Sequence, residues 1–386
     1  MSTAGTQCVA RPGIIELRFG EPDPALFPAV GLAMACADAL ADGGVGSLPY
    51  GANAGPPELR HLLGERLTGL EGREVGADET LISGGNSQAL DQVLTLFFEP
   101  GDVLLVELPT YSLALGVFRD HPVHVEAVPF DGQGLDIEAL ERKLDELAHA
   151  GRRAKALYTI PTFHNPTGIC LADDRRRRLV ELAASRDLLI VEDDVYRELW
   201  YEEPSPPSLF SLAPAGTVLR LGSFAKTLAP GLRVGWLNGT PAQVERVAES
   251  GLNDSGGCVS QFAACAVTHF VADGRYDAQI ERLRAAYRER RDAFVAALAE
   301  HLPGECTFNV PGGGFFVWVT LPGSAPGQEV LPLAEERGVS FVPAANSHLD
   351  GSDRGMRLCF TLYDAQQLAE AARRLGEAVR VAIAQT

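Results

Sequence analysis

A lysine between two apolar runs is the residue of this sequence whose setting most suggests covalent chemistry. Lys226 stands in the stretch LGSFAKTLAPGLRVGW, and the chain has only three lysines against thirty arginines. The other two lysines occupy positions typical of an exposed surface. A lysine amine can lose its proton, which arginine cannot, and in a partly buried loop it can form a Schiff base. The stretch therefore favours amine chemistry, although a lysine that extends into solvent also fits these residues.

Four apolar segments typical of parallel strands end in polar residues. Tyr111 follows DVLLVELP, and Asn165 follows AKALYTIP. The run DLLIVEDD ends in Asp193 and Asp194 and precedes Tyr196. The run TVLRLGSF contains Ser223 and precedes Lys226. In open parallel sheets, ligands bind beyond the carboxyl ends of the strands. We therefore expect an amine, a carboxylate and a phenol to converge on one crevice.

A fifth segment, LISGGNSQALDQVLTLFF, is suited to binding a phosphate. Two glycines, Asn86, Ser87 and Gln88 lead directly into an apolar helix. Free backbone N–H groups and the positive end of the helix dipole attract anions there, although a simple capped helix fits as well. An amine, a carboxylate, a phenol and a phosphate cradle are together what pyridoxal phosphate requires.

The alternation of strands and helices between residues 80 and 240 predicts a largely parallel sheet with helices on both faces. A long helical pattern at residues 270–302 leaves this region, and short strands and a final helix from Asp364 follow it. We predict a large α/β domain at residues 42–270. Residues 1–41 and 271–386 would form a smaller α+β domain.

The composition narrows the classes of partner. A formal net charge of -18 argues against nucleic acid and against an anionic membrane surface. Seven scattered cysteines, an odd number with no paired spacing, fit the reduced thiols of the cytoplasm and no metal site. Neither a leader peptide nor a stretch of transmembrane length is recognisable. We expect a cytoplasmic protein.

Motifs along nearly the whole chain resemble those of one enzyme family. They are FGEPDPALFP, PYGANAGPPELRHLL, GGNSQALDQV, ELPTYS, HNPTG, EDDVYREL, SFAKTLAPGLRVGW, PGGGFFVWV and MRLCF. The sequence resembles the class I/II aminotransferases, which are fold-type I pyridoxal-phosphate enzymes, and most of all the branch of kynurenine and 2-aminoadipate aminotransferases. The resemblance implies a mostly parallel, seven-stranded-type sheet between helices, a smaller α+β domain and pyridoxal 5'-phosphate as cofactor.

The resemblance also implies roles for the residues at the centre of the site. Lys226 would form the aldimine with the cofactor and then move the substrate proton. Asp193 would pair with the pyridinium nitrogen; Asp194 is the rival, and the spacing to Tyr196 favours Asp193. Tyr196 and Asn165 would bind the ring oxygen, and Tyr111 would stack on the ring.

Further residues would hold the phosphate and the substrate. Ser87, Gln88, Ser223 and Arg233 would bind the phosphate, with Arg233 giving a bidentate contact. Arg357, with Asn165, would bind the substrate carboxylate, and Gly20 would pass close to the substrate. Tyr50 would reach the cofactor and substrate of a neighbouring subunit, which implies a homodimer with shared sites.

Three stretches depart from the family pattern or lack an interpretation. The phosphate loop reads GGNSQAL, where relatives often have a Gly-Ser-Gln or Ser-Gly-Thr start. His164 could titrate near the ring, although plain loop structure is favoured. Gly256, Gly257 and Cys258 stand near the expected substrate entrance without an assigned role.

Transamination between an amino acid and a 2-oxo acid is the function we expect. The same residues would also serve β- or γ-elimination or replacement, as on S-adenosylmethionine or cysteine conjugates in secondary metabolism. A transcription regulator is disfavoured because the aminotransferase pattern begins by about residue 14, without a preceding winged-helix module. The preference among acidic, aromatic and modified amino acids stays open. Five aromatic residues suggest tolerance of large substrate side chains: Phe27, Tyr50, Tyr111, Phe315 and Phe316.

Overall fold

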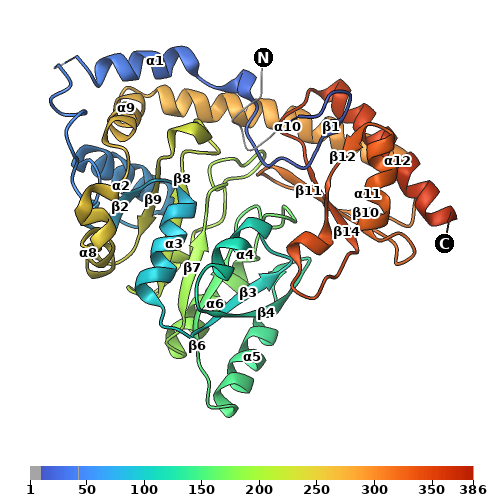
Figure 1. Ribbon diagram of the computed structural model, residues 1–386, viewed down its shortest axis with the longest axis horizontal. Coiled ribbons are helices and arrows are strands. Elements are labelled where there is room, and N and C mark those ends of the chain that lie inside the picture. Colours follow the sequence, from blue (N-terminus) through green and yellow to red (C-terminus); the bar gives the residue numbers. More distant parts are fainter. Residues whose placement is uncertain (1–9, 42, 386) are drawn as a thin grey trace.

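The structure is a computed structural model that describes residues 10–41 and 43–385. Two β-sheets of different size dominate it, and a long helix runs from the helices beside the larger sheet to the smaller one (Figure 1). Cys8 lies outside the described residues. Within those residues, no helix combines the length and the apolarity needed to cross a bilayer.

The larger sheet has eight strands, and most of them are parallel. Their spatial order is β2 (Thr80–Ser83), β9 (Gly235–Asn238), β8 (Val218–Ser223), β7 (Leu189–Asp193), β6 (Ala154–Thr159), β3 (Val103–Leu108), β4 (His124–Asp131) and β5 (Gly134–Leu135). Strands β8, β7, β6, β3 and β4 run parallel, whereas β9 is antiparallel to both of its neighbours. The expected seven-stranded sheet is confirmed, and β5 extends it by a two-residue hairpin partner of β4.

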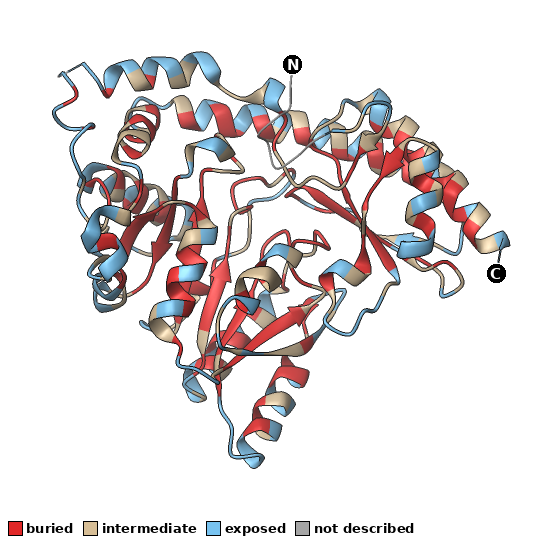
Figure 2. Ribbon diagram, viewed as in Figure 1, coloured by how far each residue is buried: buried red, intermediate tan, exposed pale blue. Residues whose placement is uncertain are grey.

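Helices cover both faces of this sheet, as the alternating pattern predicts. They are α2 (Pro57–Glu71), α3 (Asn86–Phe97), α4 (Ser112–Arg119), α5 (Ile137–His149), α6 (Asp173–Ser185), α7 (Leu209–Leu212), α8 (Pro241–Ala248) and α9 (Gln261–Ala272). Alternate residues of β3 belong to different cores: Leu105 packs with α2, α5 and α6, whereas Leu104 and Val106 pack with α3 and α4. Figure 2 shows the buried residues gathered along the strands and on the helix sides that face them.

The smaller sheet is antiparallel and has its own core. Its strands are β10 (Thr307–Phe308), β11 (Phe316–Thr320), β14 (Gly355–Cys359) and β13 (Val342–Pro343), and β1 (Ile15–Glu16) pairs with β12 (Val339–Ser340) beside it. Helices α10 (Arg275–His301), α11 (Gly327–Glu336) and α12 (Ala365–Ala384) pack on these strands. This is the α+β lobe that the sequence predicts.

The N-terminal segment contacts both lobes. Its strand β1 joins β12 in the small lobe, whereas its helix α1 (Ala29–Asp38) packs along α9 of the large lobe. Short helical turns complete the chain: η1 (Pro24–Leu26), η2 (Ala77–Glu79), η3 (Pro230–Leu232), η4 (Asn253–Gly257) and η5 (Ala344–Ser347). The domain boundaries near residues 41 and 270 stay a prediction.

Candidate active site

Lys226 lies in the turn that follows β8, where the two lobes meet. Its Nζ donates a hydrogen bond of 2.6 Å to the backbone carbonyl of Gly20, and the ring of Phe315 lies 5.7 Å from Nζ. Burial lowers the pKa of the Lys226 amine, and the negative charge of Glu21 partly opposes this. A lowered pKa enlarges the neutral fraction of the amine, which is the form that attacks a carbonyl group.

Asp193 ends β7 and is held by two hydrogen bonds. Its Oδ2 accepts from the hydroxyl of Tyr158 at 2.7 Å, and its Oδ1 accepts from Nδ2 of Asn86 at 2.8 Å. Burial raises the pKa of Asp193 to about 6, and these hydrogen bonds, together with the charge of Lys226, limit the rise. Sequence reasoning missed Tyr158, because inside an apolar strand it is indistinguishable from a core residue.

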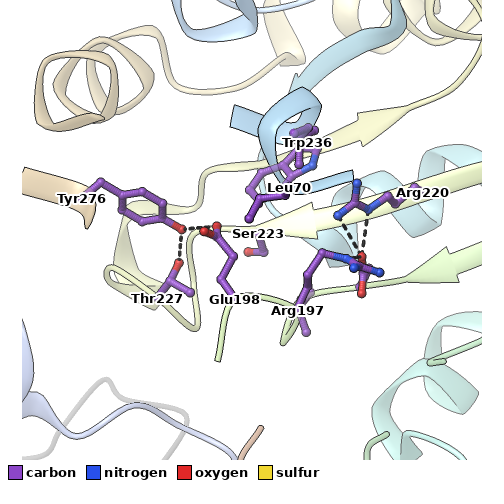
Figure 3. Close-up of a pocket in the computed structure, with 11 residues that line it drawn as sticks. Leu70, Arg197, Glu198, Arg220, Ser223, Thr227, Trp236 and Tyr276 are labelled. Atoms are coloured by element: carbon purple, nitrogen blue, oxygen red, sulfur yellow. Dashed lines mark hydrogen bonds and ion pairs between the residues drawn. The ribbon is translucent and has the colours of Figure 1, made fainter. Parts of the chain in front are cut away.

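Asp194, the alternative partner for a ring nitrogen, has different neighbours. Its Oδ2 accepts from Nε of Arg197 at 2.5 Å and from Nε of Arg220 at 2.9 Å. Both arginines also contact Glu71 of α2. Figure 3 shows these two arginines lining a small cavity of about 10 Å³, which is room for about one water molecule. The geometry therefore separates the two carboxylates: Asp194 belongs to a buried ion-pair cluster, and Asp193 interacts with Lys226.

Two tyrosines stand beside this amine and carboxylate. Tyr111 precedes α4 and Tyr196 follows β7, and each interacts electrostatically with Asp193 and with Arg357. Burial raises the pKa of both phenols, so both stay protonated at neutral pH. The structure thus brings the predicted phenols to the predicted carboxylate.

The aromatic pair in PGGGFFVWV, expected beside the side-chain pocket, is buried next to the site. Phe315 and Phe316 are both 0% exposed and pack in the core of the small lobe. Their rings contact Tyr196 edge-on, with centroids 5.3 and 5.9 Å away. Phe316 opens β11 and Phe315 precedes it, and both rings back the site from the small lobe.

Arg357 comes from β14 of the small lobe and reaches toward the large one. Its Nη1 donates to Oδ1 of Asn165 at 3.1 Å, and its Nη2 donates to the carbonyl of Arg18 at 2.5 Å. The guanidinium group stacks on Phe316, 4.5 Å from the ring centre, and the residue is 7% exposed. A planar cation fixed in this way is suited to bidentate binding of a carboxylate.

An arginine lies beside a helix N-terminus at the place where the sequence predicts an anion site. Arg233 donates to the carbonyl of Gly84 at 3.1 Å, beside the start of α3, which has no side-chain cap. Gly85 has φ +96°, and a Cβ there would lie 2.6 Å from Nη2 of Arg233, so only glycine fits. Ser87 lies in the first turn of α3, and the buried Ser223 ends β8.

Gln88, the fourth predicted phosphate ligand, is already engaged with the backbone. Its Oε1 accepts from the amide of Gly84, and its Nε2 donates to the carbonyl of Gly257 at 2.9 Å. The side chain therefore ties the phosphate loop to the segment at residues 253–257. This contact joins two loops far apart in the sequence, which no local motif reveals.

Tyr50 is set apart from this cluster. The side chain is 90% exposed, and its ring lies against Gly256, where a Cβ would come within 2.9 Å of a ring carbon. Gly256 has φ +92°, so glycine is required both for the backbone and for the space under Tyr50. Gly256, which the sequence left without a role, thus shapes the surface beneath this tyrosine, whereas Gly257 lies against Leu252.

His164 is fully buried under the loop that carries Asn165. Its Nε2 lies 3.3 Å from Oε1 of Glu107, and its Nδ1 lies 2.8 Å from Oγ1 of Thr167. Phe130 stacks on the imidazole with centroids 4.5 Å apart. These contacts agree with a structural role in the loop, the interpretation that the sequence favoured.

The assembled groups fit pyridoxal phosphate. Lys226 offers an amine, Asp193 a buried carboxylate for the ring nitrogen, and Tyr111 and Tyr196 aromatic and hydroxyl contacts. Arg233 and the start of α3 offer a cation and free N–H groups for a phosphate. One buried polar atom near this cradle, Oδ1 of Asn86, has no hydrogen-bond partner among the described residues, as expected beside a ligand site.

Comparisons with known proteins agree with this geometry. The family described as aminotransferase class I and II matches residues 12–375. The aromatic-amino-acid aminotransferase 1 of Thermococcus litoralis is 35% identical over 95% of this chain and 88% of its own length. The kynurenine aminotransferase of Pyrococcus horikoshii, solved with PMP, KYN and KYA, aligns with a TM-score of 0.91 and 34% identity, covering 96% of this chain and 91% of that one.

A further solved structure contains a cofactor adduct. It is the alpha-aminoadipate aminotransferase LysN of Thermus thermophilus, complexed with N-(5'-phosphopyridoxyl)-L-leucine. It aligns with a TM-score of 0.88 and 34% identity, covering 97% of this chain and 94% of that one.

Proposed function

The chain belongs to the class I and II aminotransferases and is a pyridoxal-phosphate-dependent transaminase, and on this premise we propose how its residues divide the reaction. Lys226 binds the cofactor and serves as the base. Asp193 holds the ring nitrogen, and Tyr196 and Asn165 bind the ring oxygen. Tyr111 stacks on the ring, while Arg233, Ser87 and Ser223 hold the phosphate, with Gln88 positioning their loop.

The single observation that carries this proposal is the meeting of three groups from distant elements. Lys226 follows β8, whereas Asp193 and Arg357 belong to β7 and β14, yet each interacts electrostatically with another of the three. When bound, the cofactor supplies an aldehyde for the amino group and a ring that accepts electrons from the α-carbon. Arg357 fixes the substrate carboxylate and thereby directs the α-hydrogen toward Nζ of Lys226.

Nζ of Lys226 is then the atom that takes and returns this proton. Burial lowers the pKa of the Lys226 amine and so enlarges its neutral fraction, which is the form that can accept a proton. The carbonyl of Gly20, 2.6 Å from Nζ, orients the amine. Amino acids and 2-oxo acids of the large-side-chain type are the substrates that we propose, in line with the names of the similar proteins.

A half-reaction tests this function against elimination or replacement. Cofactor-loaded protein is mixed with single amino acids in the absence of any oxo acid, and the products are identified. We expect one equivalent of the matching 2-oxo acid per site and no further turnover. Release of ammonia or of a side-chain group over many turnovers would instead establish elimination or replacement.

We further propose a homodimer whose sites share Tyr50. Six exposed large apolar side chains lie between residues 30 and 50: Val30, Met34, Leu40, Val45, Leu48 and Tyr50. Such a concentration of exposed apolar residues is typical of a surface that another protein covers. Leu252, close to Gly256, extends this patch. A second copy of the chain would cover it and place Tyr50 at the partner's cofactor and substrate.

Mixed dimers test the shared site. Lys226→Ala and Tyr50→Ala are each nearly inactive alone, and their subunits are allowed to exchange. With shared sites, half of the dimers are mixed and each has one intact site, so about a quarter of the wild-type activity returns. No recovery, despite verified exchange, would show that Tyr50 does not act across the interface.

We also propose a cytoplasmic location, because the seven cysteines are odd in number and have no paired spacing.

A further inference from the structure

Glu21 follows Gly20, whose carbonyl contacts Lys226, and neither the motifs nor the reaction assigns it a role. The carbonyl of the preceding residue, Gly20, accepts the 2.6 Å hydrogen bond from Nζ of Lys226. The carbonyl of Glu21 itself accepts from Oγ1 of Thr361 at 2.5 Å. Both peptide groups that flank Glu21 are therefore fixed, and its side chain is half-buried.

The distance between this carboxylate and the reacting centre is limited by covalent geometry. The Cα of Glu21 is about 3 Å from the Gly20 oxygen, and hence within about 6 Å of Nζ. From its Cα, a glutamate side chain reaches about 5 Å and a lysine-sized side chain about 6 Å. A substrate whose α-carbon lies at Nζ can therefore extend its side chain to Glu21. The electrostatic interaction of Glu21 with Lys226 agrees with this proximity.

The neighbouring carboxylates on the same segment are all paired, and Glu21 differs from them. Asp23 binds Nη2 of Arg290 at 2.6 Å, and Glu16 binds Arg11 at 2.7 Å and Arg18 at 3.1 Å. Within residues 10–41 and 43–385, the carboxylate of Glu21 forms no ion pair or hydrogen bond. A half-buried carboxylate without a partner beside a substrate site is available to a cationic ligand.

The nearby arginines already have a role or a partner, so the carboxylate of Glu21 remains available to the side chain of the substrate. Arg357 is directed at the substrate α-carboxylate through its contacts with Asn165 and Phe316. Arg18, the next arginine on this segment, is held by Glu16. A substrate with a distal carboxylate would meet the like charge of Glu21, whereas a distal ammonium or guanidinium group would be attracted.

We propose that Glu21 selects amino acids with a cationic side chain, of the size of lysine or a guanidino amino acid, as amino donors. This inference rests on the transaminase function proposed above and refines its substrate class. A charge-assisted hydrogen bond in a half-buried site corresponds to about 10- to 100-fold in kcat/KM.

The test compares three amino acids of nearly equal length: lysine, norleucine and 2-aminoadipate. Single-turnover kcat/KM is measured for wild type, Glu21→Gln, Glu21→Asp and Glu300→Gln, the last an exposed glutamate on α10. We expect wild type to prefer lysine. Glu21→Gln should reduce the lysine-to-norleucine ratio by about 10- to 100-fold, Glu21→Asp should retain most of it, and Glu300→Gln should leave it unchanged.

A binding measurement separates this inference from the function on which it rests. Calorimetry on the cofactor-loaded protein compares 6-aminohexanoate, hexanoate and adipate, which carry a carboxylate for Arg357 but no α-amino group and therefore cannot be transaminated at the α-carbon. Tighter binding of 6-aminohexanoate that is lost in Glu21→Gln supports the role of Glu21, even if no amino acid is transaminated. A change of less than threefold in both ratios, or a wild-type preference for 2-aminoadipate, overturns the inference and leaves transamination intact.

Discussion

Replacing Tyr158 by phenylalanine would raise the pKa of Asp193. The Tyr158 hydroxyl donates to Asp193 Oδ2 at 2.7 Å, and this bond favours the ionised carboxylate, whose pKa burial raises to about 6. A hydrogen bond to a charged group corresponds to about 1.5–3 kcal/mol, and 1.4 kcal/mol to one pH unit. We therefore expect the pKa in the variant to lie about 1 to 2 higher, at about 7 to 8.

Infrared titration of the cofactor-free protein measures this pKa directly. A protonated carboxyl group has its own carbonyl band, and subtraction of the Asp193→Asn spectrum isolates the contribution of Asp193. The sign follows from linkage: the folded-state pKa lies above that of an unfolded aspartate, so Asp193 favours folding most below about pH 4. That contribution is lost as the pH rises through about 6 in wild type, and at a higher pH in the variant.

Tyr201→Phe provides the matched control. Tyr201 is also buried, but its hydroxyl donates to the backbone carbonyl of Gly314 rather than to a carboxylate. This variant should lose a hydrogen bond and leave the Asp193 titration unchanged. An Asp193 pKa in Tyr158→Phe at or below the wild-type value would refute the assignment of Tyr158 as a partner of the ionised carboxylate.

Three further substitutions test other parts of the structure. Arg357→Lys removes the planar fork, so KM for the amino acid should rise about 10- to 100-fold in steady-state assays; an unchanged KM would exclude the carboxylate clamp. Arg220→Met leaves buried carboxylates short of a partner and should cost about 3–5 kcal/mol, seen as a lower thermal midpoint; an equal midpoint would contradict this. Gly222→Ala places a Cβ 2.1 Å from Trp236 and should destabilise by about 1–3 kcal/mol, whereas Gly231→Ala, with open space around it, should not.

Much of the fold was predictable because its signals are local. Strand-length apolar runs alternate with amphipathic helices, and this pattern predicts a parallel sheet covered on both faces whatever the distant contacts are. The predicted seven strands are present, and the extra strand β5 escaped notice because two residues carry no periodicity. The N-terminal segment was harder to place, since its strand and its helix pack on different lobes.

The candidate site was predicted in its types of residue but not in their partners. Lys226 was recognisable from the rarity of lysine and from its motif, and Arg357 from the motif MRLCF. That Tyr158 holds Asp193, and that Gln88 ties two loops together, depends on contacts between residues more than 30 positions apart. The burial of Phe315 could not be read from its aromatic character, because a ring suits a pocket wall and a core equally well.

The sequence by itself determined the fold class, the family and the chemical groups of the site, because periodicity and motif spacing are properties of neighbouring residues. The tertiary structure alone decided which groups meet. Asp193 and Asp194 are adjacent in the chain, yet one interacts with Lys226 and the other joins an arginine cluster. The position of Glu21 beside the amine likewise arises only when the N-terminal segment folds against β8, because burial and charge pairing depend on distance in space.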